Sequence, residues 1–136
     1  MGEVQTYSRD GFRDRSVVLP LAWSPDSRYL AVLLGLPDAS VTVIPGLAVI
    51  DTTTMTAKTI ATGAIRGASF APSGPGRLVY GQARSPLITA PVSLYTVNPD
   101  GSDRTQLTTD ANSLYQLWTA KVIVYRTAGP LSLIHI

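Results

Sequence analysis

Short runs of aliphatic, aromatic and β-branched residues alternate with polar breaks along most of the chain. Between positions 65 and 108 four such runs follow one another, at about 65–70, 77–82, 92–97 and 104–108. Pro, Gly, Asp and Asn separate these runs, which is typical of short strands joined by tight turns. No window places apolar residues at helical spacing over the length that a helix needs. The pattern therefore predicts an all-β fold.

Two of the runs, residues 30–34 and 122–125, are apolar on both faces of the expected strand. A strand of this kind has to be covered by other parts of the protein on both sides. We therefore expect these runs to be inner strands of sheets that lie between neighbouring sheets.

The runs recur with a period of about 47 residues. Leu47-Ala-Val-Ile-Asp51 falls on Leu94-Tyr-Thr-Val-Asn98 at this offset. A period of roughly 40–50 residues made of short strands is the signature of β-propeller blades. The sequence thus predicts a partial β-propeller of four-stranded antiparallel blades, with two full blades and part of a third.

Three large aromatic residues share one position of the repeat. Trp23 and Phe70 are 47 residues apart, and Trp118 lies 48 residues further on. Large aromatic side chains bury much apolar area. We interpret the three as residues of inter-blade packing or of the strand start rather than as a platform for a ligand.

The repeat also divides the chain. The expected segments are an N-terminal segment at 1–17, blade 1 at 18–63, blade 2 at 64–110 and a partial blade 3 at 111–130. Segment 1–17 is a candidate for the end of a preceding blade. The last residues, 131–136, break the pattern. Two alternatives stay open for them: the translated read-through of a sequencing adapter, or a genuine short apolar strand.

Three stretches carry a resemblance to a known family. Trp23-Ser-Pro-Asp-Ser-Arg-Tyr-Leu-Ala31 resembles the W-S-P-D-G-x-x-[IL]-A element of TolB-like β-propellers, the WD40-like PD40 repeat. Leu94-Tyr-Thr-Val-Asn-Pro-Asp-Gly-Ser-Asp-Arg-Thr-Gln-Leu-Thr108 resembles the second half of that repeat, and Leu47-Ala-Val-Ile-Asp-Thr-Thr-Thr54 resembles the V-I-D-T element of YVTN-type repeats. The second repeat departs from the pattern, with Ala-Pro-Ser-Gly at 71–74 in place of Ser-Pro-Asp-Gly.

The resemblance implies a truncated fragment, because members of this family close six or more blades into a ring. It implies a bacterial, non-catalytic interaction module that binds protein partners, in the periplasm or outside the cell. The alternative is the substrate-gating propeller domain of a prolyl-oligopeptidase-like serine peptidase. We further expect the isolated chain to self-associate, because blades without neighbours leave apolar faces and strand edges uncovered.

Composition narrows the function classes. The chain has 136 residues, enough for one domain, and a formal net charge of only +2. Its basic residues are scattered rather than clustered into a stripe, which disfavours a nucleic-acid partner. The chain contains no Cys, so it has no disulfide and no thiolate metal site. Its apolar runs are too short for membrane insertion, and the N-terminal residues lack the apolar core of a signal peptide.

The polar motifs predict no catalytic, cofactor-binding or metal-binding residue. Gly67-Ala-Ser-Phe-Ala71 is one residue short of the G-x-S-x-G elbow, but its Ser69 falls within an expected strand, without a helix after it. The acidic residues Asp100, Asp103 and Asp110 match no dedicated calcium loop. In Asn98-Pro-Asp-Gly-Ser102, Pro99 suits the second position of a type I turn and Gly101 the left-handed conformation. We therefore interpret this stretch as a corner.

Contact residues are expected in the long connections at 35–45 and 81–91, since variable loops on a rigid scaffold commonly carry recognition. The candidate interaction residues are Leu36, Val43, Leu87 and Ile88.

Overall fold

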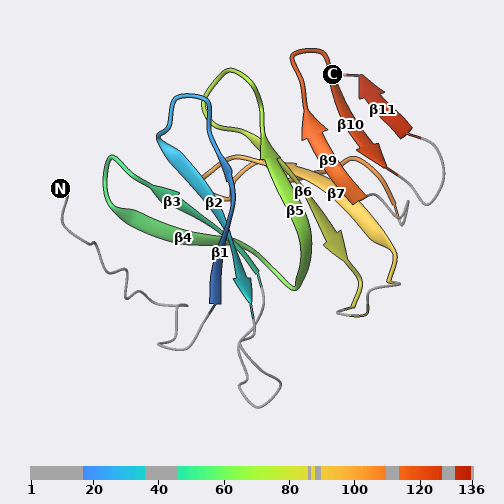
Figure 1. Ribbon diagram of the computed structural model, residues 1–136, viewed down its shortest axis with the longest axis horizontal. Helices are drawn as coiled ribbons and strands as arrows, with labels where there is room; N and C mark the ends of the chain where they lie inside the picture. The colour runs from blue at the N-terminus through green and yellow to red at the C-terminus, as the bar shows by residue number, and fades with distance from the viewer. Residues whose placement is uncertain are drawn as a thin grey trace.

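A computed structural model of the chain describes residues 17–35, 46–85, 87, 90–109, 114–126 and 131–135. Within these ranges the regular structure consists of strands in three antiparallel sheets, which lie side by side (Figure 1). The all-β fold of four-stranded blades is therefore confirmed. No helix in this part of the chain is long and apolar enough to cross a membrane.

The strands of the first two sheets follow one another in chain order. The first sheet contains β1 (Val17–Trp23), β2 (Tyr29–Gly35), β3 (Gly46–Asp51) and β4 (Thr56–Thr62). The second contains β5 (Ala64–Phe70), β6 (Leu78–Ala83), β7 (Val92–Val97) and β8 (Thr105–Gln106). The third, in the spatial order β11-β10-β9, contains β9 (Leu114–Trp118), β10 (Val122–Arg126) and β11 (Leu131–His135).

Residues 131–135, whose origin the sequence leaves open, are paired in the third sheet. Strand β11 runs antiparallel to β10, from Val122 opposite His135 to Arg126 opposite Leu131. Along it the half-buried Ser132 and Ile134 alternate with the exposed Leu133 and His135, as in a strand with one face packed.

The alternation of side chains across β6 explains how one sheet packs against two neighbours. Leu78 and Tyr80 belong to the core between the first and second sheets, whereas Val79 belongs to the core between the second and third. All three residues are fully buried. Successive side chains of a strand point to opposite faces, so an uninterrupted apolar run fills both cores at once.

The core between the first two sheets joins small and large side chains. From the first sheet come Ala31, Leu47 and Val49, and from the second come Phe70 and Tyr80, among others. Each large apolar side chain that leaves water here contributes about 1.5–3 kcal/mol. The core between the second and third sheets is smaller in the described residues, with Val79, Leu94 and Ile123 at its centre.

The first strands of the three sheets lie closest together. Strand β5 contacts β1 of the preceding sheet and β9 of the following one, while the contacts that β4 and β8 make with neighbouring sheets are fewer. Sheets that touch along one edge and separate along the other are arranged like blades around an axis. We therefore place the axis next to β1, β5 and β9, which the ribbon also shows lying toward the viewer (Figure 1).

The three aromatic residues of the repeat occupy equivalent places. Trp23, Phe70 and Trp118 are each the last residue of the first strand of a sheet, and they pair with Leu30, Leu78 and Ile123. Phe70 is only 6% exposed and packs into the core that faces the preceding sheet. Trp118 is half-buried and packs against the core of the preceding sheet in the same way.

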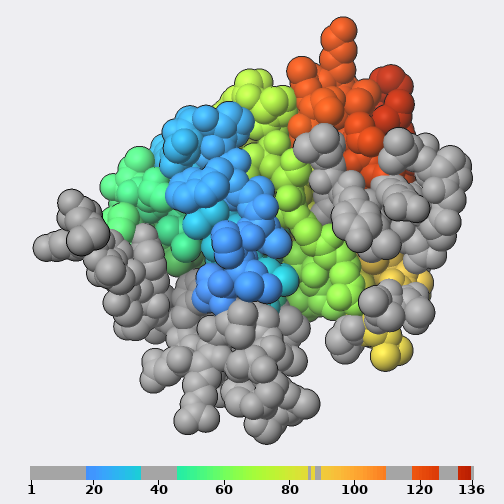
Figure 2. Space-filling view, in the orientation of Figure 1, coloured from blue at the N-terminus to red at the C-terminus, as the bar shows by residue number. Residues whose placement is uncertain are grey.

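Trp23, by contrast, has an exposed fraction of 55% and is not packed between two of the described sheets. Trp23 lies beside Leu30, which packs against the face of the first sheet that points away from the second sheet. No sheet of the described residues lies against Trp23. Further along the same face Val32 and Leu34 are buried, at 1% and 3% exposed, so the exposure is confined to β1. Figure 2 shows β1, in blue, on the open surface facing the viewer.

Candidate functional site

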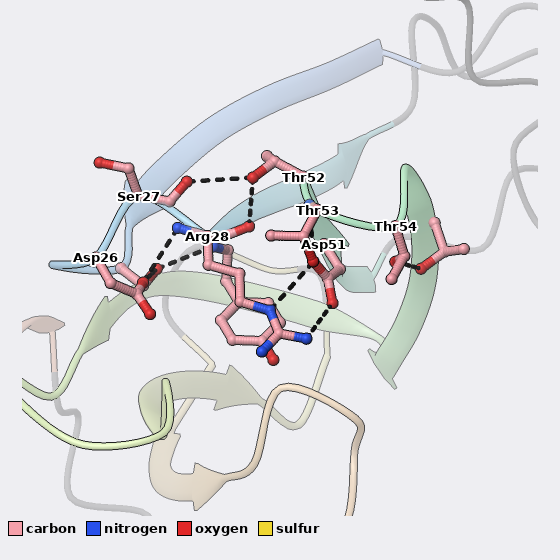
Figure 3. Close-up of polar contacts among 10 residues, drawn as sticks. Asp26, Ser27, Arg28, Asp51, Thr52, Thr53 and Thr54 are labelled. Atoms are coloured by element: carbon pink, nitrogen blue, oxygen red, sulfur yellow. Dashed lines mark hydrogen bonds and ion pairs between the residues drawn. The ribbon is translucent and has the colours of Figure 1, made fainter.

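The corner between β1 and β2 is held by its own side chains. Ser24 Oγ donates to Asp26 Oδ1 at 2.5 Å, and the same carboxylate oxygen accepts the backbone N–H of Arg28 at 3.1 Å (Figure 3). These hydrogen bonds lower the pKa of Asp26, the one from Ser24 most. Ser27 takes the left-handed conformation with φ 60°, the place at which the PD40 pattern has Gly.

A salt bridge links this corner to the next one in the same sheet. The Arg28 guanidinium donates to both carboxylate oxygens of Asp51, from Nε to Oδ1 at 3.3 Å and from Nη2 to Oδ2 at 3.0 Å (Figure 3). Thr53 also donates to Asp51 through its backbone N–H and its hydroxyl. Together, Arg28 first and Thr53 second, they hold the pKa of Asp51 well below its usual range.

The second sheet has an equivalent link between its corners, built from different residues, and we call each of the two links an arginine latch. Arg77 Nη1 donates to Asn98 Oδ1 at 3.1 Å, and Asn98 is the equivalent of Asp51 in the repeat. Arg77 also forms a salt bridge with Asp103, at 2.6 Å, and donates to the Thr96 hydroxyl at 3.0 Å. In both sheets an arginine directly before the second strand therefore ties it to the end of the third strand, which is the last strand residue in the first sheet and the residue after the strand in the second.

The stretch Asn98-Pro-Asp-Gly-Ser102 is a corner, as predicted. The Gly101 N–H donates to the Asn98 carbonyl at 2.9 Å, and Gly101 has φ 87°, so the chain turns there. Asp100 Oδ1 accepts both the N–H and the hydroxyl of Ser102, which lowers the pKa of Asp100. Asp100 thus has a structural role within the turn.

The corners of the first two sheets enclose a cleft of about 360 Å³. Its walls carry two carboxylates, Asp51 and Asp100, and one ammonium group, Lys58. Both carboxylates have lowered pKa values, so they are ionised at neutral pH and poorly suited to donate a proton. The cleft can recognise a polar or cationic group, and it holds no acid–base pair of the kind that hydrolysis needs.

Other solved structures share this arrangement of sheets. The chain is similar to a TolB protein from Agrobacterium tumefaciens with a TM-score of 0.68 and 15% identity, over 91% of this chain and 47% of that one. It is similar to TolB from Acinetobacter baumannii with a TM-score of 0.58 and 18% identity, over 90% of this chain and 30% of that one. The sheets are arranged like the propeller blades of these TolB structures.

The likeness is one of fold. No protein-family model and no curated protein sequence matches the chain. The TolB-like region spans less than half the length of either TolB structure. The two TolB structures support the resemblance inferred from the sequence motifs.

The candidate interaction residues are not brought together by the described structure. Leu87 is 68% exposed, and its carbonyl accepts a hydrogen bond from Arg66 Nη2 at 3.0 Å. Leu36, Val43 and Ile88 lie outside the described residues. A shared contact surface of these four TolB-like loop positions stays a prediction.

The two rejected motifs have structural roles. Ser69 lies within β5, and its Oγ accepts the N–H of Trp118 at 3.2 Å, which joins the second and third sheets. Asp103 pairs with Arg77, and Asp110 lies outside the described residues. Within the described ranges, no three His, Asp or Glu side chains are grouped so that they could hold a metal ion.

The sequence reasoning missed the arginine latches. A signal was present, because a basic residue precedes the second strand of every repeat, as Arg28, Arg77 and Lys121. The partners Asp51 and Asn98 are 47 residues apart, one period of the repeat. Reading these two recurrences together would have predicted an ion pair or charge-assisted hydrogen bond at each corner.

Proposed function

We propose that the chain is a non-catalytic β-propeller interaction module that binds protein partners through exposed apolar side chains of its first strand, β1. The observation that carries this proposal is the exposure of Trp23, at 55%, in a position whose equivalent Phe70 is 6% exposed. Exposed tryptophans are rare on surfaces that stay in water and are enriched at the centres of protein interfaces.

Trp23 belongs to an apolar strip along β1. Val18, Pro20 and Trp23 pair with Leu34, Val32 and Leu30, so the three lie on one face of the strand. All three are exposed, Val18 to 43%. Pro20 has no N–H to offer a further strand, which favours contact through side chains over pairing of strand edges.

The geometry of the strip indicates the kind of partner. In the second sheet the same face packs on Ala31, Leu47 and Val49, which form a small-residue aliphatic surface. The strip is therefore suited to another β-sheet with a flat aliphatic face. We take a second copy of the chain as the partner to test, because it is present in any purified sample.

Sedimentation velocity of the purified chain over a range of concentrations tests the proposal. We expect reversible self-association that Trp23→Lys abolishes, because a charge cannot be buried against an aliphatic sheet. Trp23→Phe, which copies the residue at position 70, is the matched control and should still associate. A wild-type chain that stays monomeric at every concentration, or a Trp23→Lys variant that associates as the wild type does, would contradict the proposal.

A further inference from the structure

The second sheet has a cavity at the end opposite to its corners. The cavity measures about 460 Å³ and lies where β6 ends and β7 begins. Its lining residues are Gln82, Ala83, Arg84, Ser93, Tyr95, Arg104, Gln106 and Thr109. Two of these eight residues are arginines and none is acidic.

Arg104 differs from the arginines of the two latches. Arg28 and Arg77 are both neutralised by carboxylates. The Arg104 guanidinium instead lies 4.2 Å from the centre of the Tyr95 ring and donates from Nη2 to Gln82 Oε1 at 2.9 Å. No carboxylate of the described residues forms a salt bridge with it, so its charge is available to a ligand.

Arg104 is also held in place before any ligand arrives. The Tyr95 ring beneath it stacks on the buried Tyr80 ring, with centroids 5.5 Å apart and planes 21° apart. Gln82, its hydrogen-bond acceptor, donates in turn to the Thr62 carbonyl at 2.7 Å. A guanidinium fixed by stacking and by one amide loses little side-chain freedom on binding, which favours affinity.

The rest of the lining matches the chemistry of an oxyanion. Arg84, Ser93 and Thr109 line the wall beside it. Guanidinium groups bind carboxylates and phosphates in a bidentate manner, and such charge-assisted hydrogen bonds are about twice as strong as neutral ones.

We propose that this cavity is a binding site for an oxyanion, a carboxylate or a phosphate group, with Arg104 as the residue that contacts it directly. The site is independent of the strip on β1 and lies in a different sheet. It would let the module select partners that present an acidic or phosphorylated group, which the apolar strip alone cannot distinguish.

The test is a titration of the full 136-residue chain followed by ¹H–¹⁵N NMR, with two probes in separate experiments. One probe is inorganic phosphate, and the other is an acetylated, amidated pentapeptide with a central glutamate. We expect saturable shifts of the Arg104 side-chain N–H and of neighbouring amides with at least one probe. The probe that binds more tightly identifies whether the site prefers a phosphate or a carboxylate group.

Variants separate direct contact from general charge. Arg104→Gln should weaken binding by about tenfold or more, and Arg104→Lys should fall between it and the wild type, because lysine keeps the charge without the planar fork. Lys121→Gln, which removes one charge from an exposed residue before β10, is the matched control and should bind as the wild type does. Absence of saturable shifts with both probes, or equal weakening in Arg104→Gln and Lys121→Gln, would overturn the proposal.

Discussion

Trp23 and Phe70 hold the same place in two consecutive sheets, and their surroundings differ in one respect. Each ends the first strand of its sheet and pairs with a leucine at the start of the second strand. Phe70 faces the aliphatic surface of the preceding sheet, whereas Trp23 faces no sheet of the described residues. The repeat therefore determines where an aromatic side chain is placed, and the neighbouring sheet determines whether it stabilises the fold.

The largest expected difference follows directly from this comparison. Phe70→Ala should lower the free energy of unfolding by about 3–5 kcal/mol, since it leaves a cavity between two sheets. Trp23→Ala should lower it by less than about 1 kcal/mol at concentrations where the chain is monomeric, because an exposed side chain contributes little. Equilibrium urea unfolding measures both values, and equal losses in the two variants would refute the assignment of Trp23 to an open face.

A smaller difference is expected between the two arginine latches. Asp51→Asn gives the first sheet the amide that the second sheet has in Asn98, and it should destabilise the chain modestly at neutral pH. The folded pKa of Asp51 is lowered, so its ionised form contributes stability above the unfolded pKa of about 3.9, and that contribution is lost as pH falls through the folded pKa.

The difference in unfolding free energy between wild type and Asp51→Asn should therefore be constant from pH 7 to about pH 5 and shrink progressively below about pH 4. Urea unfolding at a series of pH values measures it. An Asn98→Ala variant, which alters the uncharged latch, serves as the control with little pH dependence of its own. A wild-type advantage that grows on acidification would contradict the ion pair with Arg28.

The smallest effect concerns the core between the first two sheets. Tyr80 is fully buried, and among the described residues its hydroxyl forms no hydrogen bond of ordinary geometry, although the Arg104 guanidinium lies close enough to oppose the effect of burial on its pKa. Burial raises the pKa of this hydroxyl, which stays neutral.

Tyr80→Phe removes the unsatisfied hydroxyl and keeps the ring on Tyr95. We expect the free energy of unfolding to stay unchanged or to rise by up to about 1 kcal/mol. Thermal unfolding checks this. A clear loss of stability in Tyr80→Phe would mean that the hydroxyl has a hydrogen-bond partner in solution.

The sequence predicted much of the fold because strand pattern and turn chemistry are local. The runs at 65–70 and 92–97 match β5 and β7 closely, and Asn98-Pro-Asp-Gly turns as its residues dictate. The period placed Trp23 and Phe70 in equivalent positions. Burial of Trp23 could not be predicted in this way, because it depends on contacts with a different sheet.

The candidate sites were harder to predict for a related reason. The Arg28–Asp51 salt bridge joins residues 23 positions apart, and Arg104 reaches Gln82 across 22 positions. Neither pair forms a contiguous motif, so only the register of the strands brings the partners together. The latches were detectable through their recurrence, whereas the position of Arg104 above Tyr95 has no counterpart in the first repeat.

The most direct test of the account follows the environment of Trp23 itself. The chain has two tryptophans, so Trp118→Phe leaves Trp23 as the single fluorescent indole. At low concentration we predict efficient acrylamide quenching of Trp23, and at concentrations where sedimentation shows assemblies we predict strong protection. A Trp23 that is protected already in the monomer, or that stays fully quenchable within the assemblies, would contradict the claim that the exposed strip along β1 is an interface.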